Sequence, residues 1–247
     1  MEVWLRIARE HLDAGSVDEA RATTDVILDD DPWEWRALWY RGLAGLAADT
    51  PDTAISDFRL VYQALPGELA PKLALGMAHE AAGESKEAAR WYGIVSRTDR
   101  AFTQAAFGLA RCALANGDRA AALDALRRVS ESSRAHTAAQ CAIADALLDG
   151  DATTRADVAQ AGKVVEKLRS GSDERVALQV QVLERALELV LADGPDATEI
   201  LGTPCSEDGV RRALEQAYRT AARHAPGADG RFALVDRANA IRPRSLV

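Results

Sequence analysis

The sequence has no uninterrupted apolar run of 18 residues, few aromatic residues and only three cysteines. Without such a run no helix is expected to span a membrane, and no basic segment followed by an apolar one opens the chain, so we expect no membrane insertion and a cytoplasmic location. Cys112, Cys141 and Cys205 are too far apart for a metal knuckle or a disulfide framework. Positive charge is not in excess either: the net charge of −8 argues against nucleic acid as a partner.

Sequence motifs of catalysis are also missing. There is no glycine-rich phosphate loop, no nucleophile elbow and no set of protein-kinase motifs. The four histidines never stand four residues apart, the spacing that a zinc site on a helix needs. We therefore expect no catalytic residue, no metal site and no cofactor in this chain.

What the sequence does have is a pattern that recurs every 34 residues. In its second copy the pattern consists of Gly42, Ala54, Phe58, Val61 and Pro66. The same positions hold Ala8, Ala20, Thr24, Ile27 and Pro32 one period earlier, then Gly76, Ala88, Tyr92, Val95 and Arg100, and finally Ala110, Ala122, Leu126, Val129 and Arg134.

A 34-residue period built from two helical patterns is typical of tetratricopeptide repeats. Small residues at the positions of Gly42 and Ala54 let the two helices of a unit approach closely, and a larger residue at the position of Phe58 fills the remaining space. A helical bundle with accidental periodicity is the alternative, but bundles give heptad periods and no long repeat. The sequence predicts an all-α solenoid of tetratricopeptide repeats (TPR), a right-handed superhelix with C-terminal capping helices.

Four units are predicted at about 1–34, 35–68, 69–102 and 103–136, then a degenerate fifth repeat at 137–171, and capping helices at 172–247 that continue the array. In the last third of the chain, where the repeat pattern becomes atypical, we expect helices near 158–168, 174–191, 207–224 and 230–241. A short segment near Ile200 and Leu201 is expected between them. The acidic run Asp29–Asp31 is expected to be a loop that caps the following helix, with Pro32 in its first turn.

The concave side of such an array is the expected binding surface. Its predicted lining is mainly apolar and aromatic, and the candidate partner-binding residues are Arg36, Trp39, Leu43, Leu73, Met77, Phe107 and Arg111. An apolar groove suits a helix or an extended apolar segment of another protein. The alternative is that the C-terminal helices or a second copy of the chain cover the groove.

Several strings go beyond a generic repeat. They include the segments 35–41, 66–75, 105–111 and 200–202, and the sequence Leu234-Val235-Asp236-x-Ala238-Asn239-x-x-Arg242-Pro243. In these strings the chain resembles the C-terminal TPR domain of the actinobacterial serine/threonine protein kinase G family. The resemblance covers nearly the whole chain.

The resemblance implies a multidomain soluble kinase with a rubredoxin-like segment, then the catalytic domain, then this domain. In that family the repeats support the kinase domain and take part in dimer formation and protein contacts, and the kinase acts on a forkhead-associated regulator of 2-oxoglutarate metabolism. No catalytic or metal-binding residue of the family falls within this sequence. The resemblance thus implies a regulatory module with a protein partner: its own kinase domain, a second copy in a homodimer, or a peptide of a regulatory protein. A free-standing adaptor is the alternative.

Overall fold

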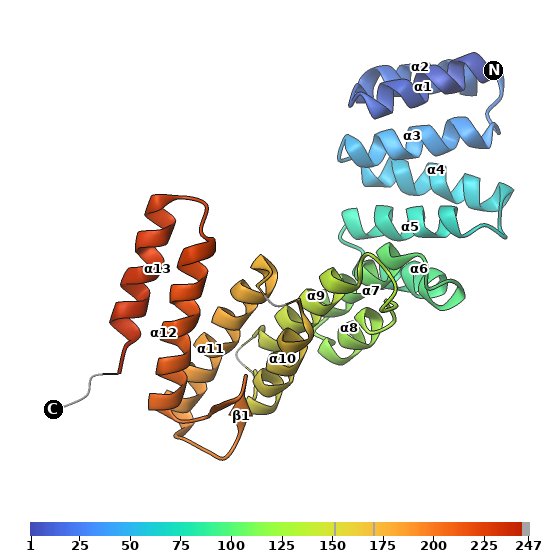
Figure 1. The fold of residues 1–247 in the computed structure, drawn as a ribbon. Coiled ribbons are helices and arrows are strands. Elements are labelled where there is room, and N and C mark those ends of the chain that lie inside the picture. Colours follow the sequence, from blue (N-terminus) through green and yellow to red (C-terminus); the bar gives the residue numbers. More distant parts are fainter. Residues whose placement is uncertain (151, 170, 244–247) are drawn as a thin grey trace. The chain divides into compact units, whose positions relative to one another are not determined.

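Pairs of antiparallel helices build most of the molecule (Figure 1). The computed structural model describes residues 1–150, 152–169 and 171–243. They form two compact units, which divide between Ser130 and Glu131. The first unit contains α1 (Glu2–Asp13), α2 (Val17–Asp30), α3 (Trp35–Ala47), α4 (Pro51–Ala64), α5 (Leu69–Ala81), α6 (Ser85–Thr98), α7 (Thr103–Ala115) and α8 (Arg119–Leu126).

The helix boundaries of the first unit follow the sequence period. Helices α3, α5 and α7 begin 34 residues apart, and so do α2, α4, α6 and α8. The turn between the two helices of each pair needs a left-handed backbone: Gly15, Gly83 and Gly117 have φ near +75°, and Asp49 takes the same place with φ of +55°. Glycine adopts this conformation without steric cost. The prediction of an all-α helical-repeat fold is confirmed.

Small residues bring the paired helices together as the sequence predicted. A Cβ atom placed on Gly42 would lie 2.5 Å from the ring of Phe58, and one on Gly76 would lie 2.8 Å from the ring of Tyr92. Gly108, in the following pair, would bring its Cβ within 2.4 Å of the same Tyr92 ring. Phe58 and Tyr92 are therefore accommodated only because glycine faces them.

Two features of the first unit differ from the expectation. The prediction of a loop at Asp29–Asp31 is wrong for its first two residues, because α2 continues through Asp30. Ile27 and Leu28 are buried and hold the last turn of α2 against the core. Pro32 lies in the turn outside α3, and the helix is capped by Glu34, whose side chain accepts a hydrogen bond from the backbone N–H of Arg36 (3.1 Å).

The helix α8 is the second difference, since it has only eight residues where α2, α4 and α6 have 14. Turns follow it up to the start of α9. Serines are frequent between 130 and 133, and serine competes with the helical backbone for hydrogen bonds.

The second unit contains α9 (His136–Leu148), α10 (Arg155–Lys167), α11 (Asp173–Asp193), α12 (Glu207–His224) and α13 (Ala228–Ile241). A β-hairpin of two short strands, β1 (Glu199–Ile200) and β2 (Thr203–Pro204), lies where the sequence predicted a short segment between helices. Ile200 is fully buried and lies near Gly162 of α10. The hairpin thereby fills a gap that a larger residue at 162 would occupy.

Arg155 fixes the loop that leads into this hairpin. Its guanidinium donates hydrogen bonds to the carbonyl oxygens of Leu189, at 3.2 Å, and Gly194, and lies 3.0 Å from the Asp196 carboxylate. The end of α11 and the following loop are therefore held against α10.

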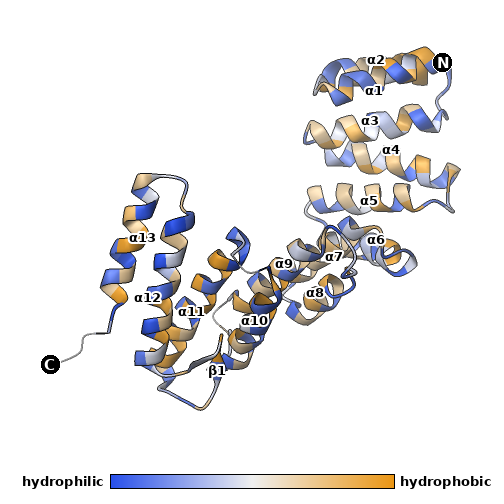
Figure 2. Ribbon diagram, viewed as in Figure 1, coloured by the Kyte–Doolittle hydropathy of each residue, from blue (hydrophilic) through white to orange (hydrophobic). Residues whose placement is uncertain are grey.

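The repeat boundaries and the assignment of 172–247 as capping helices that continue the array stay predictions. Residues 151 and 170 of the predicted fifth repeat, and 244–247 of the predicted cap, lie outside the described residues. Coloured by hydropathy, the helices of both units carry hydrophilic and hydrophobic residues in alternation (Figure 2), as expected for helices that bury one face.

Candidate functional site: the first helices of the repeat pairs

The seven candidate partner-binding residues all lie in the first unit, on α3, α5 and α7. Trp39, Leu73 and Phe107 occupy one position of the period, and Leu43, Met77 and Arg111 occupy another; Arg36 lies near the start of α3. Most of them are half-buried, whereas Met77 and Arg111 are exposed. The structure places them at the expected positions of successive helices, but their role in binding stays a prediction.

The apolar members divide between packing and exposure. Leu43 packs against the buried cluster of Phe58 and Leu75, and Leu73 packs against the cluster around Tyr92. Met77 is 46% exposed. An exposed methionine between half-buried neighbours gives this stretch a flexible apolar surface.

A cavity of about 390 Å³ adjoins Trp39. It is lined by Trp35, Trp39, Val61, Leu65, Glu68, Ala70 and Pro71, which come from α3, α4, α5 and the turn between α4 and α5. Trp39 also packs on Phe58, with ring centroids 5.4 Å apart. The same indole therefore belongs to the core and to the wall of the cavity.

Most lining residues of this cavity were absent from the sequence prediction. Trp35 stands one position before Arg36 and is 39% exposed. A helical projection of the sequence does not show that so much of its side chain is covered. Leu65 and Pro71 lie at a helix end and in a first turn, where the projection of a helix face no longer applies. One signal was available: Trp35 and Trp39 are four residues apart, so they share a side of α3.

Glu68 is the one charged residue in the lining of this cavity. Its side chain meets no cationic group and no hydrogen-bond donor within the described part of the chain, while its backbone carbonyl accepts a bond from Lys72 (3.0 Å). Two indoles beside an unpaired carboxylate suit a long apolar side chain with a positive end, since indole faces attract cations.

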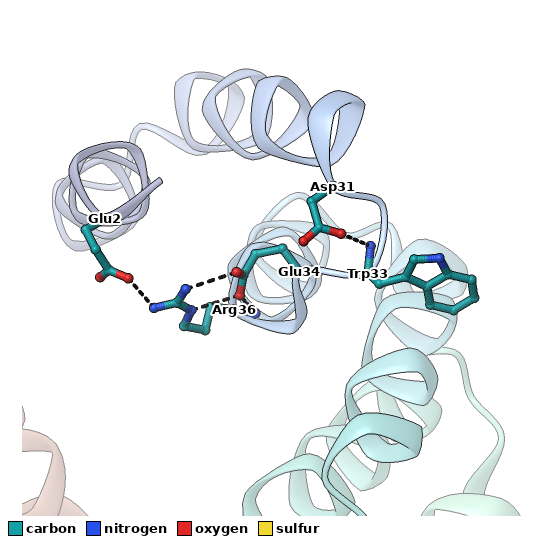
Figure 3. A network of polar contacts seen from close by, with 5 residues as sticks. All are labelled: Glu2, Asp31, Trp33, Glu34 and Arg36. Carbon is teal, nitrogen blue, oxygen red and sulfur yellow. Dashed lines mark hydrogen bonds and ion pairs between the residues drawn. The ribbon is translucent and has the colours of Figure 1, made fainter.

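Arg36 is held in a network of carboxylates (Figure 3). Its guanidinium lies 2.8 Å from Oε1 and 2.9 Å from Oε2 of Glu34, and 2.5 Å from Oε1 of Glu2 on α1. The hydrogen bonds that Arg36 donates to the Glu34 and Glu2 carboxylates raise the pKa of its guanidinium. The Trp33 ring points away from this network. Arg36 thus joins α1 to α3, and a partner would have to compete with both carboxylates for it.

Arg111 is engaged in a similar way. Its guanidinium donates to Glu80 on α5 at 2.6 and 2.9 Å, and the hydroxyl of Tyr92 donates to Oε2 of the same carboxylate at 2.6 Å. Burial by itself would raise the pKa of Glu80, but the bonds from Arg111 and Tyr92 outweigh it and hold that pKa below its ordinary value. Burial and the Glu80 carboxylate raise the pKa of the Cys112 thiol to about 11.

The depressed pKa of Glu80 predicts a dependence of stability on pH. Above pH 4.5, the ordinary value, ionised Glu80 contributes its full stabilisation, and this contribution is lost as pH falls through the lower pKa of the folded state. We expect wild type to be more stable than Glu80→Gln at pH 7, and the difference to shrink in acid. Urea denaturation of both proteins between pH 7 and pH 3 measures it. A difference that stays constant over this range would contradict the assigned network.

Within the described residues, no group of three or more histidine, cysteine, aspartate or glutamate side chains is arranged to hold a metal ion. Nor is any described helix both long and apolar enough to cross a bilayer. The first unit therefore combines an apolar cavity, an exposed methionine and two arginines held by carboxylates on the candidate surface.

Comparison with known proteins gives a consistent result. The family model described as "Protein kinase G tetratricopeptide repeat" matches residues 1–245. The serine/threonine-protein kinase PknG of Mycobacterium leprae is 37% identical over all of this chain and 33% of its own length. PknG of Mycolicibacterium smegmatis is 35% identical over 99% of this chain and 32% of its own length. The chain therefore spans about a third of the length of these curated relatives.

Solved structures resemble the fold at much lower identity. The crystal structure of YrrB, described as "a TPR protein with an unusual peptide-binding site", matches with a TM-score of 0.56 and 16% identity, over 73% of this chain and 89% of that one. At this identity the likeness concerns the fold alone.

Proposed function

Because the chain belongs to the protein kinase G tetratricopeptide repeat family, we propose that it is a non-catalytic interaction and regulatory module of a cytoplasmic serine/threonine protein kinase. It supports the kinase domain and mediates dimerisation or partner docking. Its binding surface is the row of Arg36, Trp39, Leu43, Leu73, Met77, Phe107 and Arg111, extended by the cavity at Trp35 and Trp39.

The size of the relatives supports this role. They are kinases about three times as long as this chain, so in them the matching region is one part of a larger enzyme. A module in that position has two partners within reach, the catalytic domain and a second copy of the kinase.

The cavity at Trp39 is the observation that carries the proposal. Buried aromatic side chains in apolar pockets commonly dominate the energy of protein interfaces. The unpaired Glu68 favours a cationic side chain in the cavity. The aliphatic part of a partner's lysine or arginine can pack on the indole rings while its positive charge lies near this carboxylate. We expect the inserted side chain to be long, apolar along its stem and cationic at its end.

A free-standing adaptor is the second candidate. The peptide-binding site named in the description of YrrB, which shares the fold, favours it. In that case the same surface would bind a helical or extended peptide of another protein. The DNA upstream of the Met1 codon distinguishes the two candidates: an in-frame kinase domain supports the module, and a stop codon supports the adaptor.

Binding to the catalytic region is the direct test. The intact chain is titrated with the separately purified catalytic region of PknG from M. smegmatis, and its own mass is measured by light scattering. We expect Trp39→Ala to weaken the complex or the dimer by about 2 kcal/mol or more, about 30-fold in Kd. A chain that is monomeric and has no affinity for the catalytic region would overturn the module.

Two further variants separate binding from folding. Trp35→Ala removes a cavity wall that is 39% exposed, and we expect weaker binding with an unchanged fold. Trp33→Ala is the matched control, because Trp33 is 73% exposed and outside the cavity, so binding should stay normal. Equal losses for Trp33→Ala and Trp35→Ala would show that the cavity is not the site.

A further inference from the structure

A second cavity, of about 420 Å³, lies between α12 and α13 in the other unit. It is lined by Arg219, Ala222 and Arg223 of α12 and by Arg231 and Val235 of α13. Residues three or four apart share a side of a helix, so each helix presents its lining residues together. Three of the five lining residues are arginines, and none is acidic.

This helical hairpin is basic in an acidic protein. Residues 207–243 contain seven arginines against five acidic residues, whereas the whole chain has a net charge of −8. Four of these arginines have carboxylate partners: Arg211 with Glu207 (2.8 Å), Arg212 with Asp208 (2.6 Å), Arg219 with Glu215 (2.9 Å), and Arg237 with Glu184 (3.9 Å). Their charge is compensated within the second unit.

Arg223 and Arg231 have no such partner. Arg223 donates to the hydroxyl of Thr220 at 3.1 Å, and in the described part of the chain neither guanidinium has a carboxylate within ion-pair distance. Both line the same cavity. Two positive charges without a carboxylate partner therefore border one recess, and an anion bound there would compensate both.

Arg219 adds a third guanidinium with a fixed orientation. It donates to Glu215 at 2.9 and 3.1 Å from α12 and to the side-chain oxygen of Asn239 on α13 at 3.1 Å. An arginine held by two helices loses little further side-chain freedom when it binds a ligand. It can therefore contribute remaining N–H groups to an anion that Arg223 and Arg231 attract.

Apolar surface lies next to these charges. Ala222 is buried and Val235 half-buried in the lining, and Phe232, which follows Arg231 on α13, is 64% exposed. Ala238 is the only residue of α13 that is buried. A ligand that fits this region carries a concentrated negative charge and apolar groups beside it.

We propose that the cavity between α12 and α13 binds a phosphorylated segment of a partner protein. One phosphate group carries a charge of about −1.5 to −2 at pH 7, which matches the two uncompensated arginines, whereas one carboxylate compensates only one. Guanidinium groups bind phosphate oxygens in pairs of parallel hydrogen bonds. Side chains next to the phosphorylated residue then pack on Val235 and Phe232. This site is independent of the surface at Trp39 and of its partner.

A nucleic acid is a poor fit, because many phosphates in a row would meet the acidic surface of a chain with net charge −8. A single phosphate flanked by apolar side chains meets only the local basic recess. The charge pattern thus favours a phosphoprotein segment.

Fluorescence polarisation tests the proposal with the intact chain. The probes are a degenerate phosphoserine and phosphothreonine peptide library and the same library without phosphate. We expect binding of the phosphorylated library only, and a loss of about 10-fold for Arg223→Gln and for Arg231→Gln, the loss expected when a hydrogen bond to a charged group is removed. Because neither arginine has an ion pair, both variants should melt at the wild-type temperature.

Arg212→Gln is the matched control, since Arg212 is an exposed arginine on the same helix, paired with Asp208 and outside the cavity. It should bind the phosphorylated library as wild type does. Equal binding of the unphosphorylated library, or an equal loss for Arg212→Gln, would overturn the proposal. Two more experiments can overturn it. In the first, inorganic phosphate at the same concentration as the peptides displaces them completely. In the second, the chain binds vesicles that contain phosphatidylserine but binds neither peptide library.

Discussion

Replacing Phe58 with alanine is expected to lower the free energy of unfolding by about 3–5 kcal/mol, the range for deleting a buried aromatic side chain. Phe58 is fully buried, packs against the ring of Trp39 and lies against Gly42. The structure around a deleted core side chain relaxes only partially, so we expect a cavity to remain where the ring was. Urea denaturation followed by circular dichroism measures the loss, and Arg59→Ala, an exposed neighbour on α4, is the control with little expected change.

A second substitution tests the cause of this loss. Gly42→Ala alone should destabilise the protein, because its Cβ atom would lie 2.5 Å from the Phe58 ring. In the Phe58→Ala background the same substitution meets no ring, and alanine is the better helix former by about 1 kcal/mol. The effect of Gly42→Ala should therefore change sign. The same sign in both backgrounds would mean that the ring and Gly42 are not in the contact described.

Replacing Tyr92 with alanine is expected to cost about as much, again about 3–5 kcal/mol, for a partly different reason. The ring lies between Gly76 of α5 and Gly108 of α7, and its hydroxyl donates to Glu80. The variant therefore leaves a cavity between two helix pairs and also removes a donor from the carboxylate that binds Arg111.

The conservative variant separates these two contributions. Tyr92→Phe keeps the ring and removes only the hydroxyl, so we expect a loss of about 1–2 kcal/mol, the net value of a hydrogen bond to a charged group. Thermal and urea unfolding of both variants provide the comparison. If Tyr92→Phe costs as much as Tyr92→Ala, the hydroxyl rather than the packing of the ring would dominate.

The repeat made most of the first unit predictable. A period in the sequence becomes a period in space because each helix pair buries its apolar face on the next one. As expected, the small residue Gly42 lies against the large residue Phe58, and Gly76 lies against Tyr92. Even the left-handed turn position is periodic, although Asp49 replaces glycine there.

Where the period ends, prediction depended on local signals and was less complete. The α9–α13 helices were foreseen from apolar spacing, but the hairpin at Ile200 was not, because two paired residues on each side are too short for an alternating pattern. The loop predicted at Asp29–Asp31 failed for a related reason: three acidic residues suggest a loop, but the burial of Ile27 and Leu28 decides where α2 ends.

For the candidate site, the sequence placed residues on helices but did not give their contacts. Arg36 and Arg111 were predicted to face a partner, and each is already bound to carboxylates of its own unit. The pairing of Arg36 with Glu2 could have been predicted from the sequence, since the two residues are one period apart and so occupy the same place in adjacent repeats. The Trp39 cavity could not be predicted from the sequence, because it depends on how a helix end and a turn pack around two indoles.

The position of Tyr92 between two glycines has a consequence for how such a protein can change during evolution. Repeat arrays lengthen and shorten by gene duplication and deletion at unit boundaries, and the sequence predicts such a boundary near residue 102. A deletion at that point would remove Gly108 and leave the outer side of Tyr92 without its neighbour. We therefore expect the predicted third and fourth repeats to be gained or lost together, as one heritable block of about 68 residues, twice the period of the repeat.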